Sequence, residues 1–149
     1  MVKIDKDKAC FFCHRYLNRD VTIDGVILKG DKVLLIKRKV DPYINYWALP
    51  GGHVSFDETV EEAVKREVTE ETGLECTKLS FIGVYSDPHR HPQQSVALAY
   101  SVKVAGGKAI AGSDALSLKY FDINLLPDKL AFDHKKIISD FLRKSSTYI

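Results

Sequence analysis

Three glutamates are spaced so that they could share a metal ion. Glu67, Glu70 and Glu71 stand at i, i+3 and i+4, which on a helix places them within an arc of about 100°. That arc overlaps the apolar stripe of the same segment, so we expect the acids on the side that packs against the protein. Each unscreened carboxylate pair would repel by roughly 3 kcal/mol at about 5.5 Å and a dielectric constant near 20, so a cation should lie among them. Oxygen ligands suit Mg²⁺ or Mn²⁺, which in turn suit the phosphate oxygens of a substrate.

A simpler interpretation of the segment ETVEEAVKREVTEETG is a solvated, charge-rich helix surface. This interpretation accounts well for Glu61 and Glu62. It accounts poorly for the three glutamates above, because like charges one turn apart on a packing face repel and cannot reach water easily. Metal-assisted phosphoryl chemistry is therefore the favoured hypothesis.

The helix that carries these acids has recognisable ends. Ser55 is followed three positions later by Glu58, which is the pattern of a capping box. Gly73 stands where a helix would need a left-handed terminating residue. We therefore predict a helix over 58–72.

The guanidinium of Arg66, on the same helix, has two possible carboxylate partners. Glu58 lies two turns before Arg66, where its carboxylate could hold the guanidinium and orient the helix and the preceding loop. Glu62 lies one turn before Arg66 and is the rival partner. The sequence does not decide between the two.

The remaining elements predict a sheet covered by helices. Val21 to Leu28 and Val33 to Ile36 are expected to form a hairpin around Gly30-Asp31, and 41–56 to form a structured loop. A last helix, apolar on one side, should follow Asp133. Three further strands are predicted over 79–84, 95–104 and 116–121.

Composition narrows the class of protein. The chain has 149 residues, 45% of them apolar, and a net charge of +2, which is too small to argue for nucleic acid or an anionic membrane as a partner. We find no apolar run long enough for a membrane helix and no signal-peptide core. Three cysteines favour free thiols in a reducing compartment. We expect one domain over 1–149, cytoplasmic, with 1–19 as an N-terminal extension.

The segment CFFCH resembles half of a zinc ribbon. It supplies Cys10, Cys13 and His14, whereas a closed zinc site needs four ligands. The other cysteine, Cys76, begins a predicted core strand. We therefore favour an apolar N-terminal segment that packs on the domain or on a second subunit, which makes a homodimer possible.

The acidic helix completes a known motif. Gly52, five residues, Glu58, seven residues and then REVTEETGL from Arg66 match GX5EX7REUXEEXGU at every specified position, so the chain resembles the Nudix hydrolases. The resemblance covers roughly 20–145 and includes VLLIKRK and YWALPGG. It implies an α/β/α sandwich, with a mixed sheet between helices, that hydrolyses a nucleoside diphosphate linked to another moiety.

The resemblance also assigns roles to residues. It implies that Glu67, Glu70 and Glu71 bind Mg²⁺ or Mn²⁺, and that the Gly51 carbonyl completes the metal site. Glu58 and Arg66 belong to the same catalytic motif. The proton of the attacking water would pass to a carboxylate of the motif or to an acid on a later loop. Asp114 is the candidate on that loop, although a turn-capping role would suit it equally.

Two further segments suggest a substrate. SDPHRHP and LAFDH resemble the ADP-ribose pyrophosphatase branch, which implies cleavage of ADP-ribose to AMP and ribose 5-phosphate. That branch tends to read SDPxRDPR, and here His91 and Gln93 replace its second Asp and second Arg. One alternative is an oxidised or ordinary nucleoside triphosphate, as in MutT-type enzymes. Another is a nucleotide-binding sensor without turnover.

Several other residues have two interpretations each. Arg38 and Arg90 could contact phosphate or ribose, or be solvated. Tyr46 and Trp47 could stack on a base or plug the core, and for Trp47 we favour the plug. The histidines are expected to be polar loop residues without a role in the motif; they are His53, His89, His91 and His134.

Overall fold

The described residues form two four-stranded sheets. The structure is a computed structural model that describes residues 8–9, 14, 16–112 and 115–146. The first sheet is mixed, because β1 and β7 run parallel and its other pairs run antiparallel. Its order is β5 (Gly51–His53), β1 (Val21–Val26), β7 (Val96–Val104) and β6 (Cys76–Tyr85). In the second sheet, β3 (Lys32–Arg38) pairs antiparallel with β2 (Leu28–Lys29), β4 (Trp47–Ala48) and β8 (Ala115–Asp122).

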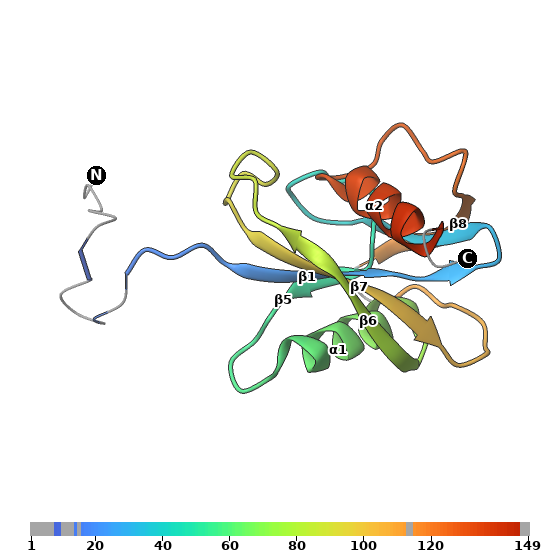
Figure 1. Ribbon diagram of the computed structural model, residues 1–149, viewed down its shortest axis with the longest axis horizontal. Helices are drawn as coiled ribbons and strands as arrows, with labels where there is room; N and C mark the ends of the chain where they lie inside the picture. The colour runs from blue at the N-terminus through green and yellow to red at the C-terminus, as the bar shows by residue number, and fades with distance from the viewer. Residues whose placement is uncertain (1–7, 10–13, 15, 113–114, 147–149) are drawn as a thin grey trace.

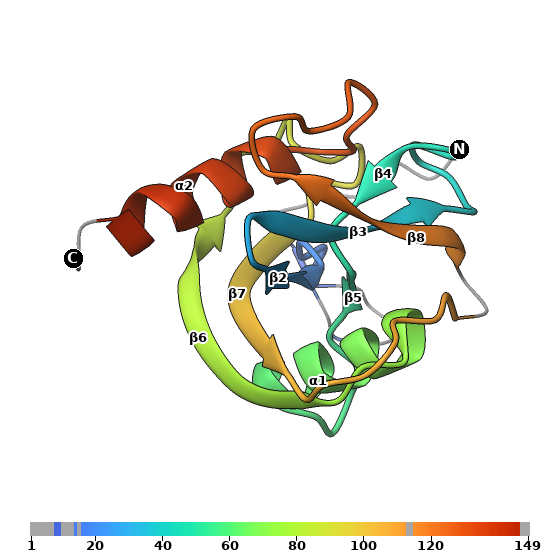
Figure 2. The ribbon, with the colours of Figure 1, turned by 90° about the vertical axis from the view of Figure 1, so that its right-hand side faces the viewer.

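Two helices cover opposite sides of these sheets (Figures 1 and 2). Helix α1 (Val60–Thr72) packs on β1, β5 and β6, and α2 (His134–Ser146) contacts β6 at the other side. This arrangement confirms the predicted mixed sheet between helices. Neither helix in the described ranges is long and apolar enough to cross a membrane.

Strand β3 forms the centre of the core because both of its faces are buried. Val33 and Leu35 join the cluster that packs under α2, and Leu34 joins the cluster under α1. All three side chains are completely buried. A strand buried on both faces has a continuous apolar run instead of alternation, which is the pattern of VLLI.

The predicted hairpin is only partly correct. The turn lies at Gly30, which has φ of 61°, but the strands on either side of it are β2 and β3. Residues 21–26 belong to the other sheet, where β1 pairs with β5 and β7. The chain crosses between the sheets at Ile27, which is fully buried and accepts a hydrogen bond from the Leu34 amide. The predicted loop over 41–56 likewise contains β4 and β5.

Helix α1 begins at Val60, two residues after the predicted start at 58, and Ser55 is not its N-cap. The N-cap is Thr59, whose hydroxyl accepts from the Glu62 amide while the Glu62 carboxylate accepts from the Thr59 amide. Glu58 does accept from the Ser55 amide at 2.7 Å, but this turn precedes the helix. The predicted C-terminus is confirmed, since Gly73 adopts a left-handed conformation with φ of 68°.

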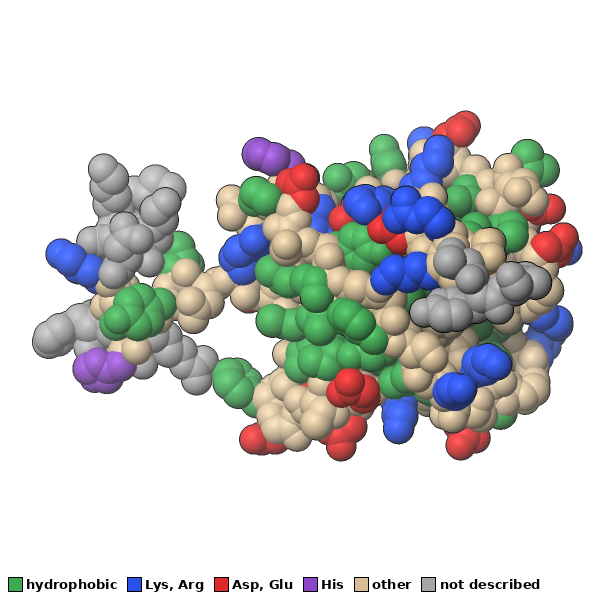
Figure 3. All heavy atoms as spheres, viewed as in Figure 1, with side chains coloured by type: hydrophobic (Ala, Val, Ile, Leu, Met, Phe, Trp, Pro, Cys, Tyr) green, Lys and Arg blue, Asp and Glu red, His purple; other side chains and the backbone are tan. Residues whose placement is uncertain are grey.

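Apolar side chains gather on one face of the first sheet, over β6 and β7 (Figure 3). Phe81 and Val84 of β6 are 55% and 56% exposed there. β6 is also the last strand of its sheet, so its outer edge has no neighbouring strand among the described residues. The homodimer stays a prediction.

The segment after β7 returns to close the end of α1. The amide of Ile110 donates to the Thr72 carbonyl, and that of Gly112 donates to the Glu71 carbonyl. A side chain at residue 112 would meet the backbone oxygen of Glu70 at 1.7 Å. Only glycine allows this approach, which supplies partners for carbonyls that a helix end otherwise leaves free.

We expect Gly112→Ala to lower the free energy of unfolding by about 2 kcal/mol or more, because the added carbon displaces the segment from α1. Gly106→Ala is the matched control, since a side chain there would meet nothing within 4 Å. Urea denaturation followed by circular dichroism measures both. Equal stability of the two variants would contradict the close approach.

Candidate active site

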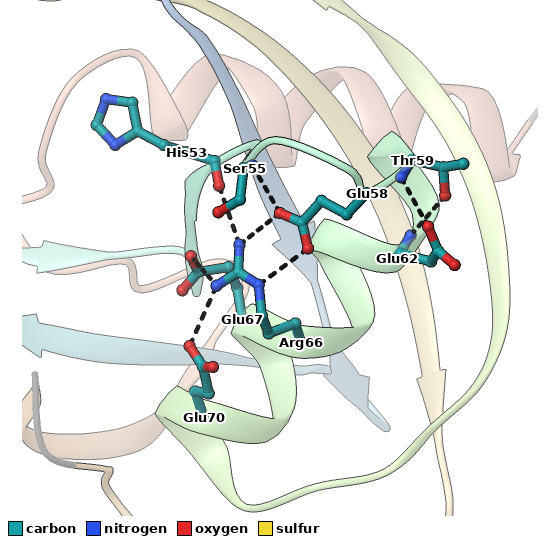
Figure 4. Close-up of polar contacts among 8 residues, drawn as sticks. All are labelled: His53, Ser55, Glu58, Thr59, Glu62, Arg66, Glu67 and Glu70. Carbon is teal, nitrogen blue, oxygen red and sulfur yellow. Dashed lines mark hydrogen bonds and ion pairs between the residues drawn. The ribbon is translucent and has the colours of Figure 1, made fainter.

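Arg66 holds three carboxylates together on the surface of α1 (Figure 4). Its Nε and Nη2 donate to the two oxygens of Glu58 at 3.0 and 2.7 Å, a bidentate pair. Its Nη1 donates to Glu67 at 2.8 Å and to Glu70 at 3.2 Å, and Nη2 also reaches the His53 carbonyl at 3.1 Å. Glu58 is therefore the partner of Arg66. Glu62, the rival, is engaged in the helix cap.

The three glutamates of the predicted metal site differ in burial. Glu71 is 9% exposed, and the Glu67 side chain is 15% exposed. The Glu70 side chain is 59% exposed, so the expectation that all three face the core is wrong for Glu70. The reason is that Glu70 lies beside Arg66 at the rim of the helix, whereas Glu71 faces β5.

Two glycines of β5 lie close to the acids of α1. The Gly51 amide donates to Glu71 Oε2 at 2.8 Å. At Gly52, a side chain would meet the Glu67 carboxylate at 2.3 Å. The glycine pair thus places the backbone of residues 51–52 directly against two of the acids.

The electrostatics of this group favour a cation. Burial raises the pKa of Glu71 to about 8, and the nearby charges of Glu67 and Asp24 act in the same direction. Hydrogen bonds from Arg66 and from the Ser55 amide lower the pKa of Glu58 to about 2. Because Glu71 ionises so reluctantly, its carboxylate has too little positive charge beside it. The carboxylate oxygens of Glu71 and of the neighbouring acids are the kind of ligand that Mg²⁺ or Mn²⁺ prefers.

The acids open into a cavity of about 540 Å³. This volume is within the usual range for small-molecule sites. Glu67, Glu71 and Arg38 are among the residues that line it. Its wall also includes Gly51, Gly52, Asp24, Arg66, Arg90, His91, Phe132 and His134.

Arg90 is neither solvated nor free. It is 8% exposed, and its Nε and Nη2 bind the carboxylate of Asp133 at 2.7 to 3.0 Å. Its Nη2 also lies 3.6 Å from Asp24 Oδ2. The surface interpretation of Arg90 is therefore wrong, and its guanidinium is engaged in joining the loop after β6 to the start of α2.

Arg38 faces the cavity with a more available charge. Its Nε donates to the Pro42 carbonyl at 2.8 Å, and its guanidinium lies 5.0 Å from the centre of the Phe132 ring. Burial lowers the pKa of Arg38, and the charges of Glu71 and Asp24 oppose this effect. The side chain is consequently held in the wall of the cavity, where it is partly exposed.

The two loop aromatics have different surroundings. Trp47 packs edge-on against Phe121 at 4.7 Å and joins the α2 core, which confirms it as a plug. Tyr46 packs edge-on against Tyr43 at 5.3 Å and does not line the cavity among the residues described. Stacking of a base on Tyr46 stays a prediction.

Two buried residues were not among the predicted site residues. Asp24 is 7% exposed in the middle of β1, where an acid in the apolar run VTIDGV is the signal that could have identified it. His134 is 2% exposed and begins α2, so its prediction as a polar loop residue is wrong. Its Nε2 lies 3.2 Å from Asp24 Oδ1. His91 stacks on Phe132 at 5.0 Å in the cavity wall.

Some predictions concern residues outside the described ranges. Asp114, Cys10 and Cys13 lie there, so the structure tests neither the loop base nor the zinc motif, of which it describes only an exposed His14. Within the described part of the chain, no three His, Cys, Asp or Glu side chains are already gathered as a metal site. Arg66 accounts for this in part, because it occupies Glu67 and Glu70.

Comparison with known proteins identifies the family. The model of the NUDIX domain matches residues 18–141. The ADP-ribose pyrophosphatase of Methanocaldococcus jannaschii is 52% identical over 129 residues, which are 86% of this chain and 76% of that protein. A putative 8-oxo-dGTP diphosphatase of Bacillus subtilis is 36% identical over 117 residues, 78% of this chain and 74% of that protein.

Solved structures share the fold. A MutT/nudix family protein from Enterococcus faecalis superposes with a TM-score of 0.78 at 33% identity, covering 89% of this chain and 64% of that one. A bifunctional NMN adenylyltransferase/ADP ribose pyrophosphatase from Francisella tularensis, complexed with AMP and a Mn ion, gives 0.71 at 26% identity, covering 85% of this chain and 42% of that one.

The chain belongs to the Nudix family. With its complete motif on α1 and its acids at a cavity, it is a Nudix hydrolase.

The pKa of Glu71 predicts how stability depends on pH without metal. Between about 4.5, the value for an ordinary glutamate, and about 8, the folded state keeps a proton that the unfolded state has lost, so the stability contributed by this group falls as pH rises. Glu71→Gln removes that loss. In urea titrations with EDTA, we expect the variant to gain about 2 to 4 kcal/mol over wild type between pH 5 and pH 8.5.

Glu58→Gln is the control for this measurement. A carboxyl with a pKa of about 2 is ionised in both states above pH 5, so its difference from wild type should stay constant over the same range. A constant difference for Glu71→Gln as well would contradict the raised pKa.

Proposed function

We propose that this Nudix hydrolase cleaves ADP-ribose to AMP and ribose 5-phosphate with Mg²⁺ or Mn²⁺. The observation that carries the proposal is that Glu67, Glu71 and Arg38 line the same cavity, which has a volume of about 540 Å³. A diphosphate needs cationic partners, and this cavity offers both carboxylates that could hold a metal ion and the guanidinium of Arg38. The identity of 52% with an archaeal ADP-ribose pyrophosphatase supports this choice of substrate.

The residues present fit a divalent metal ion. Glu67, Glu70, Glu71 and the Gly51 carbonyl would hold it, and the buried Glu71 gains the positive charge that its raised pKa indicates it lacks. When bound, such an ion neutralises diphosphate oxygens and acidifies water. Arg66 now contacts Glu67 and Glu70, so it would have to yield both while its bidentate pair with Glu58 keeps it in place.

The other residues would orient the substrate. Arg38 would contact the diphosphate, since its guanidinium lines the cavity and its backbone partners fix its position. Arg90 would act mainly through its pair with Asp133, because its donors are already engaged. A base for the attacking water would be one of the carboxylates of α1 or Asp114.

The proposal predicts that Glu70→Gln and Glu71→Gln each lower kcat/KM for ADP-ribose at least 100-fold at saturating Mg²⁺, because each removes a charged ligand. Glu62→Gln is the control, since Glu62 serves the helix cap, and its kcat/KM should stay within about threefold of wild type. Turnover within tenfold of wild type in both test variants would refute the metal assignment.

A second candidate substrate is an oxidised nucleoside triphosphate. It is favoured by the Bacillus subtilis relative and by the loop in which His91 and Gln93 replace residues of the ADP-ribose branch. His91 brings an aromatic ring, stacked on Phe132, to the cavity wall where that branch has a carboxylate.

A side-by-side measurement of kcat/KM separates the two substrates. We expect ADP-ribose to exceed 8-oxo-dGTP, other nucleotide sugars and dinucleotides by at least tenfold. The reverse order for 8-oxo-dGTP would establish the second candidate. Tight binding of ADP-ribose without product would instead favour the nucleotide sensor.

A further inference from the structure

A buried histidine connects α2 to the glycine pair of the active site. His134 is 2% exposed, and its Nδ1 accepts a hydrogen bond from the Leu49 amide at 2.9 Å. Leu49 is 2% exposed, so its amide has no access to water as an alternative partner. The contact joins the first residue of α2 to the segment that leads into Gly51.

The same contact determines where the histidine carries its proton. Because Nδ1 accepts, the neutral ring carries its hydrogen on Nε2. Nε2 lies 3.2 Å from Asp24 Oδ1, outside hydrogen-bonding geometry, and is buried without another partner among the described residues. The Asp24 carboxylate therefore favours the tautomer that leaves Nδ1 free to accept. Arg90 supports this carboxylate from its other side, at 3.6 Å.

The segment from Leu49 to Gly51 is held on two sides. His134 holds its first amide, and β1 holds the rest, since the Gly25 amide donates to the Pro50 carbonyl at 2.8 Å. A side chain at Gly51 would lie 2.1 Å from the Ile23 carbonyl, so the backbone is pressed against β1. The Gly51 amide then donates to Glu71.

We propose that His134 is a positioning residue: its Nδ1 fixes the Leu49 amide and thereby sets the distance between the Gly51 backbone and Glu71. The inference rests on the proposed function for its effect on catalysis. Its structural part, the fixing of residues 49–51, stands on the contacts alone. His134 itself does not touch the acids of α1 in this scheme.

Three substitutions of His134 distinguish the role of Nδ1 from that of Nε2. In His134→Asn the amide oxygen can take the place of Nδ1 and keep an acceptor for Leu49. His134→Gln places its amide near Nε2, so the acceptor for Leu49 is lost. His134→Phe keeps the ring volume and loses both nitrogens. Ile138→Ala is the control, because Ile138 is a buried residue of α2 that belongs to the core and not to this contact.

The first readout does not need substrate. Amide hydrogen exchange of a peptide spanning residues 47–53, read by mass spectrometry on the full chain, should accelerate at least tenfold in the Gln and Phe variants. It should stay within threefold of wild type in the Asn variant and in Ile138→Ala, with exchange compared at equal distance below each melting temperature. Titration with Mn²⁺ alone should give a Kd raised at least fivefold in the Gln and Phe variants only.

The second readout is turnover of ADP-ribose. We expect kcat at saturating Mn²⁺ to fall at least tenfold for Gln and Phe, with KM changed less than threefold, and kcat to be largely retained in Asn. Equal exchange and equal Mn²⁺ affinity in the Asn and Gln variants would overturn the inference. Failure of the proposed function is distinguishable, since wild type would then not cleave ADP-ribose while the exchange difference between Asn and Gln remained.

Discussion

The site depends on the confinement of negative charge at one end of α1. Glu67 and Glu71 lie against the backbone of Gly51 and Gly52, and Arg66 is the cation that binds Glu67 in the protein alone. Burial of the acids and proximity of the glycines are two aspects of one packing contact between α1 and β5. Because like charges in a partly desolvated position are costly, either a proton on Glu71 or a positive partner lowers the free energy of this contact. Arg66 and a metal ion would be alternative partners for the same oxygens.

Helix periodicity and the positions of the glycines predict much of the structure around α1. The end of α1 at Gly73 and the pairing of the helix with a sheet follow from local chemistry. The sequence predicts the wrong start for α1 because two successive segments match the capping-box pattern. They are Ser55 with Glu58 and Thr59 with Glu62. In the structure the first forms a separate turn and the second caps the helix. Sequence spacing alone does not say which pattern the backbone follows.

The cluster of buried polar residues in the cavity wall could not be predicted from local sequence patterns. The cluster consists of residues from three distant segments, Asp24, Arg90 and His134. The sequence around each residue does not predict its contact with the other two. The periodicity of α1 likewise assigned Glu70 to the inside because it treats a helix as an ideal cylinder against a flat surface. In the protein Glu70 lies at the edge of that face, beside Arg66, and its side chain reaches water.

The pair of Arg90 and Asp133 joins the two segments, SDPHRHP and LAFDH, whose resemblance suggested the substrate. Each supplies one half of a single buried ion pair, so neither is an independent module. A loop grafted from a relative without an arginine at position 90 would leave Asp133 without its counter-charge unless the start of α2 were transplanted with it. Attempts to redesign selectivity in this scaffold should therefore exchange both segments together.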